Sequence, residues 1–285
     1  MQRIRGTEHD LGDGFIVARV LPQFARRTIG PFVFFDYFGP AEMPPGKGVD
    51  VRPHPHIGLA TVTYLFEGSQ VHRDSLGSVQ EITPGDVNWM TAGRGIVHSE
   101  RTAPQVRAAG HRMHGVQSWG GLPKADEETA PSFQNVAKAD LPTWSRDGVR
   151  LRQVAGTAFG LTAPVNTFSP IFYADAQFAD GAKLKMTDEY PERAVFVVAG
   201  AIAINGETCR DGDMAVLDEG EVAMLTAKNA ARAMLLGGAP LDGPRHLWWN
   251  FVSSSPERIE RAKVQWKAQQ LGTIEGDPEF IPLPE

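Results

Sequence analysis

Cysteine is almost absent from this chain, since Cys209 is the only one among its 285 residues. A single thiol excludes an intramolecular disulfide framework, a cysteine-rich zinc site and a Cys-x-x-Cys redox pair. A chain that uses no disulfides suits a reducing compartment, so we expect a cytoplasmic protein.

Long apolar runs and basic clusters are also lacking. No stretch approaches the roughly 20 apolar residues of a membrane span, and residues 1–10 carry charged side chains rather than the apolar core of a signal peptide. The net charge of -6 opposes binding to a phosphate backbone, and no run of Lys and Arg offsets it. We therefore expect neither a membrane nor a direct nucleic-acid partner.

Turn-forming residues are abundant instead. The 30 Gly and 21 Pro favour many short strands over long helices, which predicts an all-β fold. A chain of 285 residues exceeds the usual size of one compact core, so two domains are expected. A polar connection containing Pro142 and Gly148 marks the boundary, which gives domains at residues 1–136 and 137–285.

Short apolar stretches between Gly, Pro and Asp residues predict strands in both halves. In the first half they cover residues 15–21, 32–38, 60–66, 87–91 and 116–119. In the second half they cover residues 151–155, 171–176, 194–198, 214–217, 222–226 and 233–236.

The two halves also resemble each other. The stretch YLFEG at residues 64–68 precedes the turn PGD at 84–86, as FVVAG at 196–200 precedes DGD at 211–213. In each half an apolar strand ends in glycine, a hairpin-like excursion follows, and a Gly-Asp turn starts another strand. This pattern predicts two duplicated antiparallel barrels.

One helix is predicted near the end of the chain. Ser255 can cap it, and Pro256 suits the first helical position. Side chains at residues 259, 262, 263 and 266 then share one face, which we expect to pack against the exterior of a barrel. Gly272 offers a stop for this helix.

Two short polar segments carry the candidate chemistry. His54 and His56 flank Pro55, and His98 and Glu100 flank a serine. Side chains two residues apart share one face of a strand, so each pair can reach a single ion. Pro55 cannot donate a hydrogen bond within a sheet, so we expect its segment at a sheet edge. Two strands would then supply four ligands.

Three His and one Glu suit a divalent transition metal, and imidazole alone leaves Fe, Ni, Cu, Zn and Mn open. On a six-coordinate ion these ligands leave two positions for water, substrate or O₂, whereas structural zinc sites are usually closed. The alternative is that these four residues are surface or hydrogen-bonded core groups that bind no metal, because a single His-x-His pair arises by chance in many proteins. A second pair of matching spacing in the same domain favours the metal.

Other histidines are weaker candidates. His72 and Asp74 lie two apart and can orient a ligand, although histidine in a hairpin is commonly an ordinary polar residue. His111 and His114 are an odd number of residues apart, so at most one of them faces inward. His114 or Gln117 can hydrogen-bond to a ligating imidazole, but surface exposure explains them equally well.

The stretch from Pro84 to Glu100, PGDVNWMTAGRGIVHSE, resembles the pirin family of bicupins. The resemblance extends through essentially the whole chain, including FFD at residues 34–36 and WWNF at 248–251. It implies two tandem cupin domains, which are jelly-roll-like β-barrels, with a C-terminal helix. It also implies that the N-terminal barrel binds one metal ion, commonly iron as Fe(II), through His54, His56, His98 and Glu100.

This chain departs from the broad cupin pattern at Ala60 and Thr61, where a glutamate ligand often follows the histidine pair, so Glu100 takes that role. Aligned on the glycines of the repeat, the four ligands of the first barrel correspond in the second barrel to Met186, Asp188, Leu225 and Ala227. We therefore expect the second barrel to hold no metal.

The resemblance implies two functions. Some members resemble flavonol dioxygenases, so a quercetin-type or other chelating aromatic substrate and O₂ would meet at the ion, with Glu100 accepting a substrate proton. Eukaryotic members act as transcription cofactors, so the alternative is a non-enzymatic metal or redox sensor that modulates a protein partner. A monomer is expected in either case.

Overall fold

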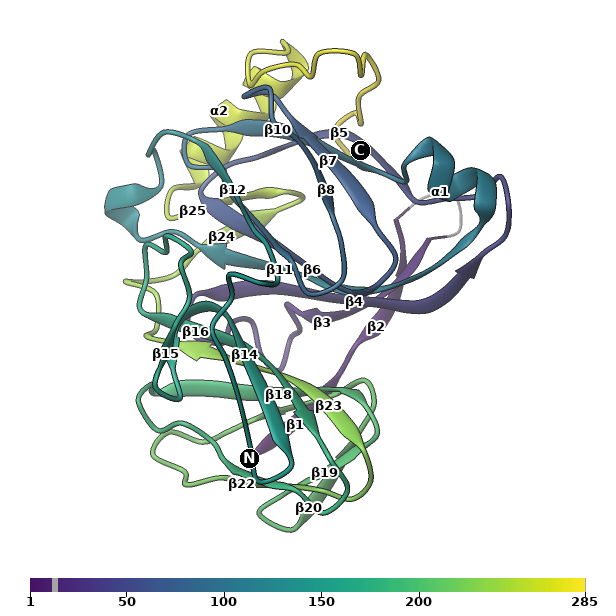
Figure 1. The fold of residues 1–285 in the computed structure, drawn as a ribbon. Coiled ribbons are helices and arrows are strands. Elements are labelled where there is room, and N and C mark those ends of the chain that lie inside the picture. Colours follow the sequence, from purple (N-terminus) through teal and green to yellow (C-terminus); the bar gives the residue numbers. More distant parts are fainter. Residues whose placement is uncertain (12–14, 285) are drawn as a thin grey trace. The chain divides into compact units, whose positions relative to one another are not determined.

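Strands make up most of the chain, and they form two separate units (Figure 1). The computed structural model describes residues 1–11 and 15–284. Unit 1 comprises Met1–Thr7, Ala18–Phe35 and Ala139–Pro240. Unit 2 comprises Glu8–Val17, Asp36–Lys138 and Leu241–Glu285.

Unit 1 contains a large and a small antiparallel sheet. The large sheet has the order β1-β21-β18-β23-β16-β14-β13, with β15 beside β14. Its strands are β1 (Gln2–Arg5), β13 (Thr143–Arg146), β14 (Val149–Ala158), β15 (Leu161–Thr162), β16 (Ile171–Phe178), β18 (Glu192–Ala199), β21 (Asp213–Val216) and β23 (Ala231–Gly238). The small sheet contains β17 (Lys183–Lys185), β22 (Met224–Ala227), β19 (Ala201–Ile204) and β20 (Glu207–Arg210).

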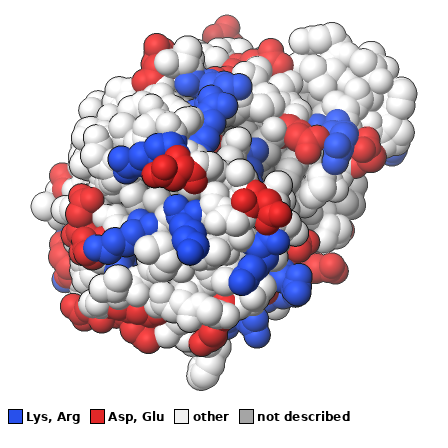
Figure 2. Space-filling model, turned by 60° about the horizontal axis from the view of Figure 1, so that its bottom comes forward, with Lys and Arg blue, Asp and Glu red and all other residues white. Residues whose placement is uncertain are grey.

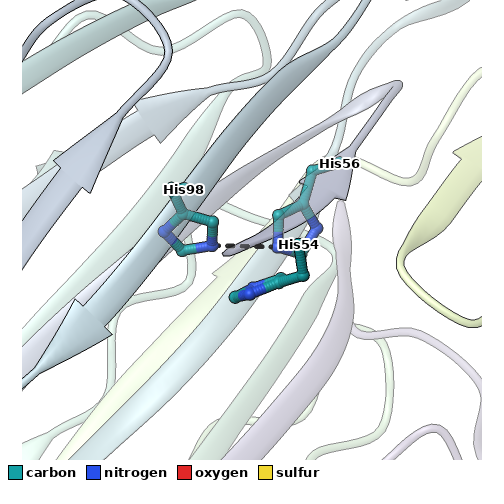
Figure 3. Close-up of side chains that lie close together, drawn as sticks. All are labelled: His54, His56 and His98. Carbon is teal, nitrogen blue, oxygen red and sulfur yellow. Dashed lines mark hydrogen bonds between the residues drawn. The ribbon is translucent and has the colours of Figure 1, made fainter. Parts of the chain in front are cut away.

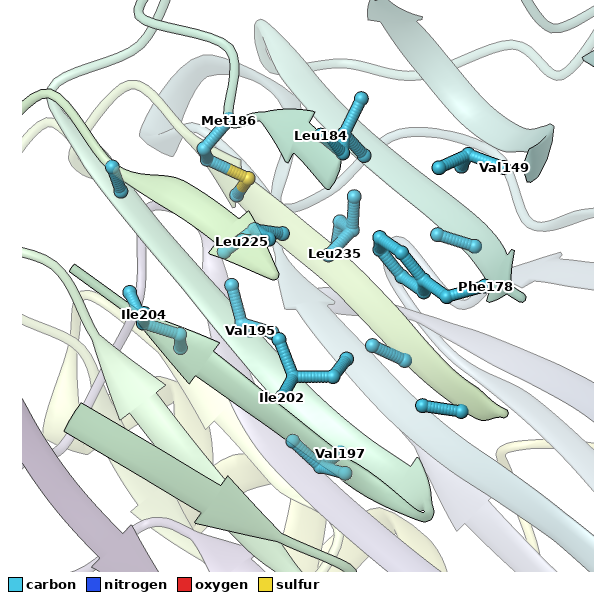
Figure 4. Packing of buried hydrophobic residues seen from close by; sticks show 14 of the residues in the cluster. Val149, Phe178, Leu184, Met186, Val195, Val197, Ile202, Ile204, Leu225 and Leu235 are labelled. Carbon is cyan, nitrogen blue, oxygen red and sulfur yellow. The ribbon is translucent and has the colours of Figure 1, made fainter. Parts of the chain in front are cut away.

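The core of unit 1 is apolar and lies between these two sheets. Alternate side chains such as Val195 and Val197 of β18 point into it, because residues two apart share a strand face (Figure 4). Met186 and Leu225, which match His54 and His98 in the repeat, are buried in this apolar cluster. Asp188 is exposed and pairs with a lysine.

The thiol of Cys209 is buried in the same core, with 0% of the residue exposed. Burial raises the pKa of this thiol, so less of the reactive thiolate forms at pH 8 than in an unfolded chain. We expect alkylation of native Cys209 at pH 8 to be at least about 100-fold slower than in denatured protein, because reaction requires local opening. Thiol titration with a chromogenic disulfide checks this, and equal rates would contradict it.

Unit 2 also pairs a large sheet with a small one. The large sheet, which lies mainly in this unit, contains in spatial order β12 (Ser132–Val136), β9 (Val87–Thr91), β6 (Leu59–Glu67), β11 (His111–Gly121), β4 (Phe32–Met43), β3 (Ile16–Leu21) and β2 (Thr7–Asp10). The small sheet contains β5 (Asp50–His56), β10 (Ile96–Arg101), β7 (Gln70–Asp74) and β8 (Val79–Ile82). Outside them lie α1 (Pro104–Ala109), the 3-10 turn η1 (Lys124–Asp126), β24 (His246–Trp248), β25 (Phe251–Ser253) and α2 (Pro256–Lys267).

The predicted terminal helix is confirmed as α2. The Ser255 hydroxyl accepts a hydrogen bond from the Arg258 backbone N–H at 3.2 Å, and Pro256 occupies the first turn. Ile259 and Trp266 are buried against an apolar cluster of unit 2, as expected for the predicted face. The helix ends at Lys267 rather than at Gly272, because Gln269 already adopts a left-handed φ of 54°.

The predicted fold class is confirmed: the chain is all-β with two cupin-like units and a C-terminal helix. Each unit is built from two separate sheets, so in the described residues the jelly rolls remain open sandwiches rather than closed barrels. The sequence division at residues 136 and 137 lies near the junction between Lys138 and Ala139. The two units also exchange the end segments of the chain. The N-terminal strand β1 belongs to unit 1, where it pairs with β21, and the last 45 residues belong to unit 2.

The surface drawn in Figure 2 carries Lys and Arg interspersed with Asp and Glu. Neighbouring charges of opposite sign weaken each other's field, so this face does not present one extended patch of a single sign. Among the described residues, neither helix has the length and apolar character that crossing a membrane requires.

Candidate metal centre

Two neighbouring strands of the small sheet in unit 2 bring the histidines together. β5 is an edge strand, as Pro55 predicted, and it pairs antiparallel with β10. His54 lies directly opposite His98 in this pairing, and His56 lies opposite Ile96. The side chains of all three histidines therefore emerge from one face of the sheet.

The pairing changes register after His98. Glu100 lies opposite Val51, because two residues of β5, Arg52 and Pro53, oppose a single residue of β10. A proline within the extra pair suits such a bulge, since it has no N–H to donate to the neighbouring strand. Glu100 is thereby offset from the histidine pair of β5.

The rings of His54, His56 and His98 point toward one another (Figure 3). One ring nitrogen from each lies within 4.8 Å of the other two. All three residues are buried, with exposed fractions of 6%, 1% and 1%. The group therefore has the geometry to hold a metal ion.

Hydrogen bonds orient two of these rings. His54 Nδ1 lies 2.8 Å from the carbonyl oxygen of Arg52, and His56 Nδ1 lies 3.2 Å from that of Asn250. A carbonyl oxygen only accepts, so each Nδ1 must carry the proton and donate it. In a neutral imidazole this leaves a lone pair on Nε2, the atom that is then free to coordinate an ion.

Burial keeps the three imidazoles neutral. It lowers the pKa of His54 to about 4 and lowers the pKa values of His56 and His98 well below the usual value. Neutral imidazole is the form that binds metal, so no proton has to be displaced near pH 7.

The spacing of the Nε2 atoms fits an ion. His56 Nε2 and His98 Nε2 are 3.1 Å apart, the contact marked in Figure 3. Adjacent ligands with metal–nitrogen bonds of about 2.1 Å are separated by roughly 3.0 Å in octahedral geometry. This contact is a hydrogen bond when one of the two nitrogens carries a proton, and a cation can take the place of that proton between two unprotonated nitrogens.

Glu100 lies outside the close group of three histidines. Its Oε1 accepts hydrogen bonds from Thr63 Oγ1 at 3.3 Å and Gln117 Nε2 at 3.2 Å. Burial raises the pKa of this carboxyl group, and the two hydrogen bonds oppose the shift. Gln117 thus contacts Glu100 rather than a histidine. Sequence spacing could not identify Thr63 as a partner of Glu100, because Thr63 lies on a strand of the opposite sheet.

His72 and Asp74 of β7 are part of the same cluster. His72 Nδ1 lies 3.4 Å from His98 Nδ1, and His72 Nε2 lies 2.9 Å from Asp74 Oδ2. Hydrogen bonds from the His72 ring and the Ser78 backbone outweigh burial and lower the pKa of Asp74. His114 is placed elsewhere, with Nε2 3.0 Å from the Tyr37 hydroxyl.

Comparison with known proteins agrees with this architecture. The Pirin family matches residues 14–120, and the Pirin C-terminal cupin domain matches residues 173–272. A pirin-like protein of Caulobacter vibrioides is 49% identical over 280 residues, covering 97% of this chain and 96% of the relative. Human pirin is 31% identical over 275 residues, covering 93% of this chain and 91% of the relative.

A solved structure resembles the whole chain. The crystal structure of quercetin 2,3-dioxygenase from Acinetobacter baumannii superposes with a TM-score of 0.92 at 34% identity, covering 100% of this chain and 95% of the other. Two family domains match this chain, its relatives align over nearly their full length, and the solved structure has the same fold as this chain. The chain belongs to the pirin family.

Proposed function

We propose that unit 2 binds one divalent transition metal ion through His54, His56 and His98, with Glu100 beside it, and acts as a dioxygenase on flavonol-like substrates. The observation that carries this proposal is the convergence of three buried imidazoles, each with one ring nitrogen within 4.8 Å of the other two. Each coordinating imidazole is neutral and already oriented, so little reorganisation is needed to bind an ion.

The substrate class is supported by a relative and by the walls of the site. The Acinetobacter baumannii structure, 34% identical, bears the name quercetin 2,3-dioxygenase. In this chain, Thr63 and its cross-strand partners Asn88 and Gln117 are placed on the face of the large sheet that meets Glu100. These side chains can hydrogen-bond to phenolic and keto oxygens of a chelating aromatic.

Aromatic side chains flank the same interior. The Trp119 ring lies 5.1 Å from the ring of His56, edge to face, and Phe133 stacks on His72 at 4.2 Å. Flat apolar surfaces beside polar groups suit a planar polyhydroxylated molecule and exclude water from the reacting atoms.

A transition metal held by His54, His56 and His98 would supply Lewis acidity and a template for a chelating substrate. The residues of the chain do the remaining work. Glu100 accepts the proton of a substrate hydroxyl. Thr63 and Gln117 hold the Glu100 carboxylate in place through their hydrogen bonds. His54, His56 and His98 keep the ion in the buried interior.

Oxygen consumption tests the proposal. Protein loaded separately with Fe(II), Mn, Ni, Cu or Zn is incubated aerobically with a flavonol, and O₂ uptake and substrate absorbance are followed. Fe(II) is the first metal to try, because the resemblance to the pirin family implies iron. We expect substrate-dependent O₂ uptake with at least one metal. If every form behaves like metal-free protein, the dioxygenase proposal is wrong.

Removing one imidazole tests the metal site itself. We expect His98→Ala to weaken metal binding on the order of 100-fold, because four-ligand zinc sites bind with roughly 10 to 16 kcal/mol, about 3 kcal/mol per ligand. Competition with a chromogenic chelator measures the affinity. His246→Ala removes an exposed histidine of β24 and serves as the control. Unchanged affinity in His98→Ala would contradict the assignment.

A further inference from the structure

A chain of three buried side chains runs away from the candidate metal site. His98, His72 and Asp74 are 1%, 4% and 2% exposed. Their contacts are His98 Nδ1 to His72 Nδ1 at 3.4 Å and His72 Nε2 to Asp74 Oδ2 at 2.9 Å. Phe133 stacks on the His72 ring at 4.2 Å and 9°, which fixes the plane of that ring.

The direction of these hydrogen bonds follows by elimination. The Asp74 carboxylate only accepts, so His72 Nε2 carries a proton and donates it. A neutral His72 then has a lone pair on Nδ1, which accepts a hydrogen bond from His98 Nδ1. His98 consequently carries its proton on Nδ1 and leaves Nε2 free, 3.1 Å from the Nε2 of His56.

We propose that Asp74, acting through His72, sets the tautomer of His98 that presents its Nε2 lone pair to the metal. This inference rests on the proposed metal site and deepens it. His54 and His56 obtain the same orientation from backbone carbonyls, which mutation leaves in place. His98 depends on two side chains, so its tautomer can be changed by substitution. His72 and Asp74 are positioning residues.

The surroundings of Asp74 dictate what an amide would do there. Asp74 Oδ1 accepts hydrogen bonds from the backbone N–H groups of Leu76 at 2.9 Å and Ser78 at 3.0 Å. In Asp74→Asn the asparagine carbonyl oxygen takes the position of Oδ1, because the two backbone N–H groups need an acceptor there. The NH₂ group then takes the position of Oδ2 and donates to His72 Nε2. His72 then carries its proton on Nδ1 and donates to His98, which moves the His98 proton to Nε2.

The experiment determines directly which ring nitrogen of His98 carries the proton. Protein with ¹⁵N-labelled histidine is prepared metal-free, and the ¹⁵N shifts of the ring nitrogens identify the protonated atom of each histidine. We expect His98 to be protonated at Nδ1 in wild type and at Nε2 in Asp74→Asn. Metal affinity of the variant should fall about 10- to 100-fold, as is typical when a partner of a ligating histidine is lost.

Asp86→Asn provides a matched control. Asp86 also accepts backbone hydrogen bonds in a turn of unit 2, from Thr83 at 3.0 Å and Lys138 at 2.8 Å, so among the described residues its partners are of another kind than the histidine that Asp74 contacts. We expect the tautomers and the metal affinity of this variant to match those of wild type.

A second variant covers the case in which Asp74→Asn does not fold. His72→Phe keeps an aromatic ring against Phe133 but removes the acceptor for His98, so His98 should populate both tautomers and bind metal more weakly. The inference is overturned if His98 keeps a single Nδ1–H form and wild-type affinity in the folded variants. It is also overturned if wild-type His72 is protonated on both nitrogens. Absence of metal binding in wild type would instead refute the proposed function, whatever the tautomers.

Discussion

Glu100→Gln is expected to reduce O₂-dependent turnover about 100- to 10,000-fold, the usual contribution of a general base. Glutamine keeps the size of the side chain and an oxygen that accepts from Thr63 and Gln117. It cannot take up the proton of a substrate hydroxyl, however. The three histidines form a close group without Glu100, so the metal should remain bound with an affinity within roughly tenfold of wild type.

Steady-state O₂ uptake and metal analysis of the same sample separate these two effects. Glu81→Gln is the matched control, because Glu81 is an exposed residue of β8 in the same small sheet. Turnover within threefold of wild type in Glu100→Gln would show that another group accepts the proton. A large loss of metal together with turnover would assign Glu100 a ligand role instead.

The histidine cluster was accessible from sequence because strand geometry repeats every two residues. Two i, i+2 pairs on neighbouring strands suffice to place His54, His56 and His98 on one face. The position of Glu100 was not accessible in the same way. The bulge beside Pro53 alters the register, and a register shift depends on how two strands pair rather than on the spacing within either one.

His72 illustrates a second limit. Its spacing from Asp74 was visible, but its contact with His98 depends on β7 pairing with β10, 26 residues later in the chain. The exchange of end segments between the units was hidden for the same reason, since nothing in β1 itself indicates that it pairs with β21. The α2 helix was predictable because its cap and its buried face are local features.

A buried ion pair ties the C-terminal segment of unit 2 to the rest of that unit. Arg245 Nε lies 2.7 Å from Glu127 Oε1, with the two side chains 2% and 7% exposed. Glu127 also accepts hydrogen bonds from the Ser253 hydroxyl at 2.9 Å and the Ser254 backbone N–H at 2.8 Å. These contacts join η1 to the residues just before α2, which packs beside β25.

Glu127→Gln should therefore destabilise unit 2 by about 3 kcal/mol, because it leaves a buried guanidinium without its main counter-charge. The loss stays at the lower end of the range for broken buried pairs, since Asp242 still contacts Arg245. Urea unfolding followed by tryptophan fluorescence measures the change. Glu128→Gln is the control: Glu128 is 58% exposed in its pair with Arg258, so solvent screens it and we expect a loss below about 1 kcal/mol. Equal stability of the two variants would mean that desolvation of Glu127 and Arg245 already cancels their attraction.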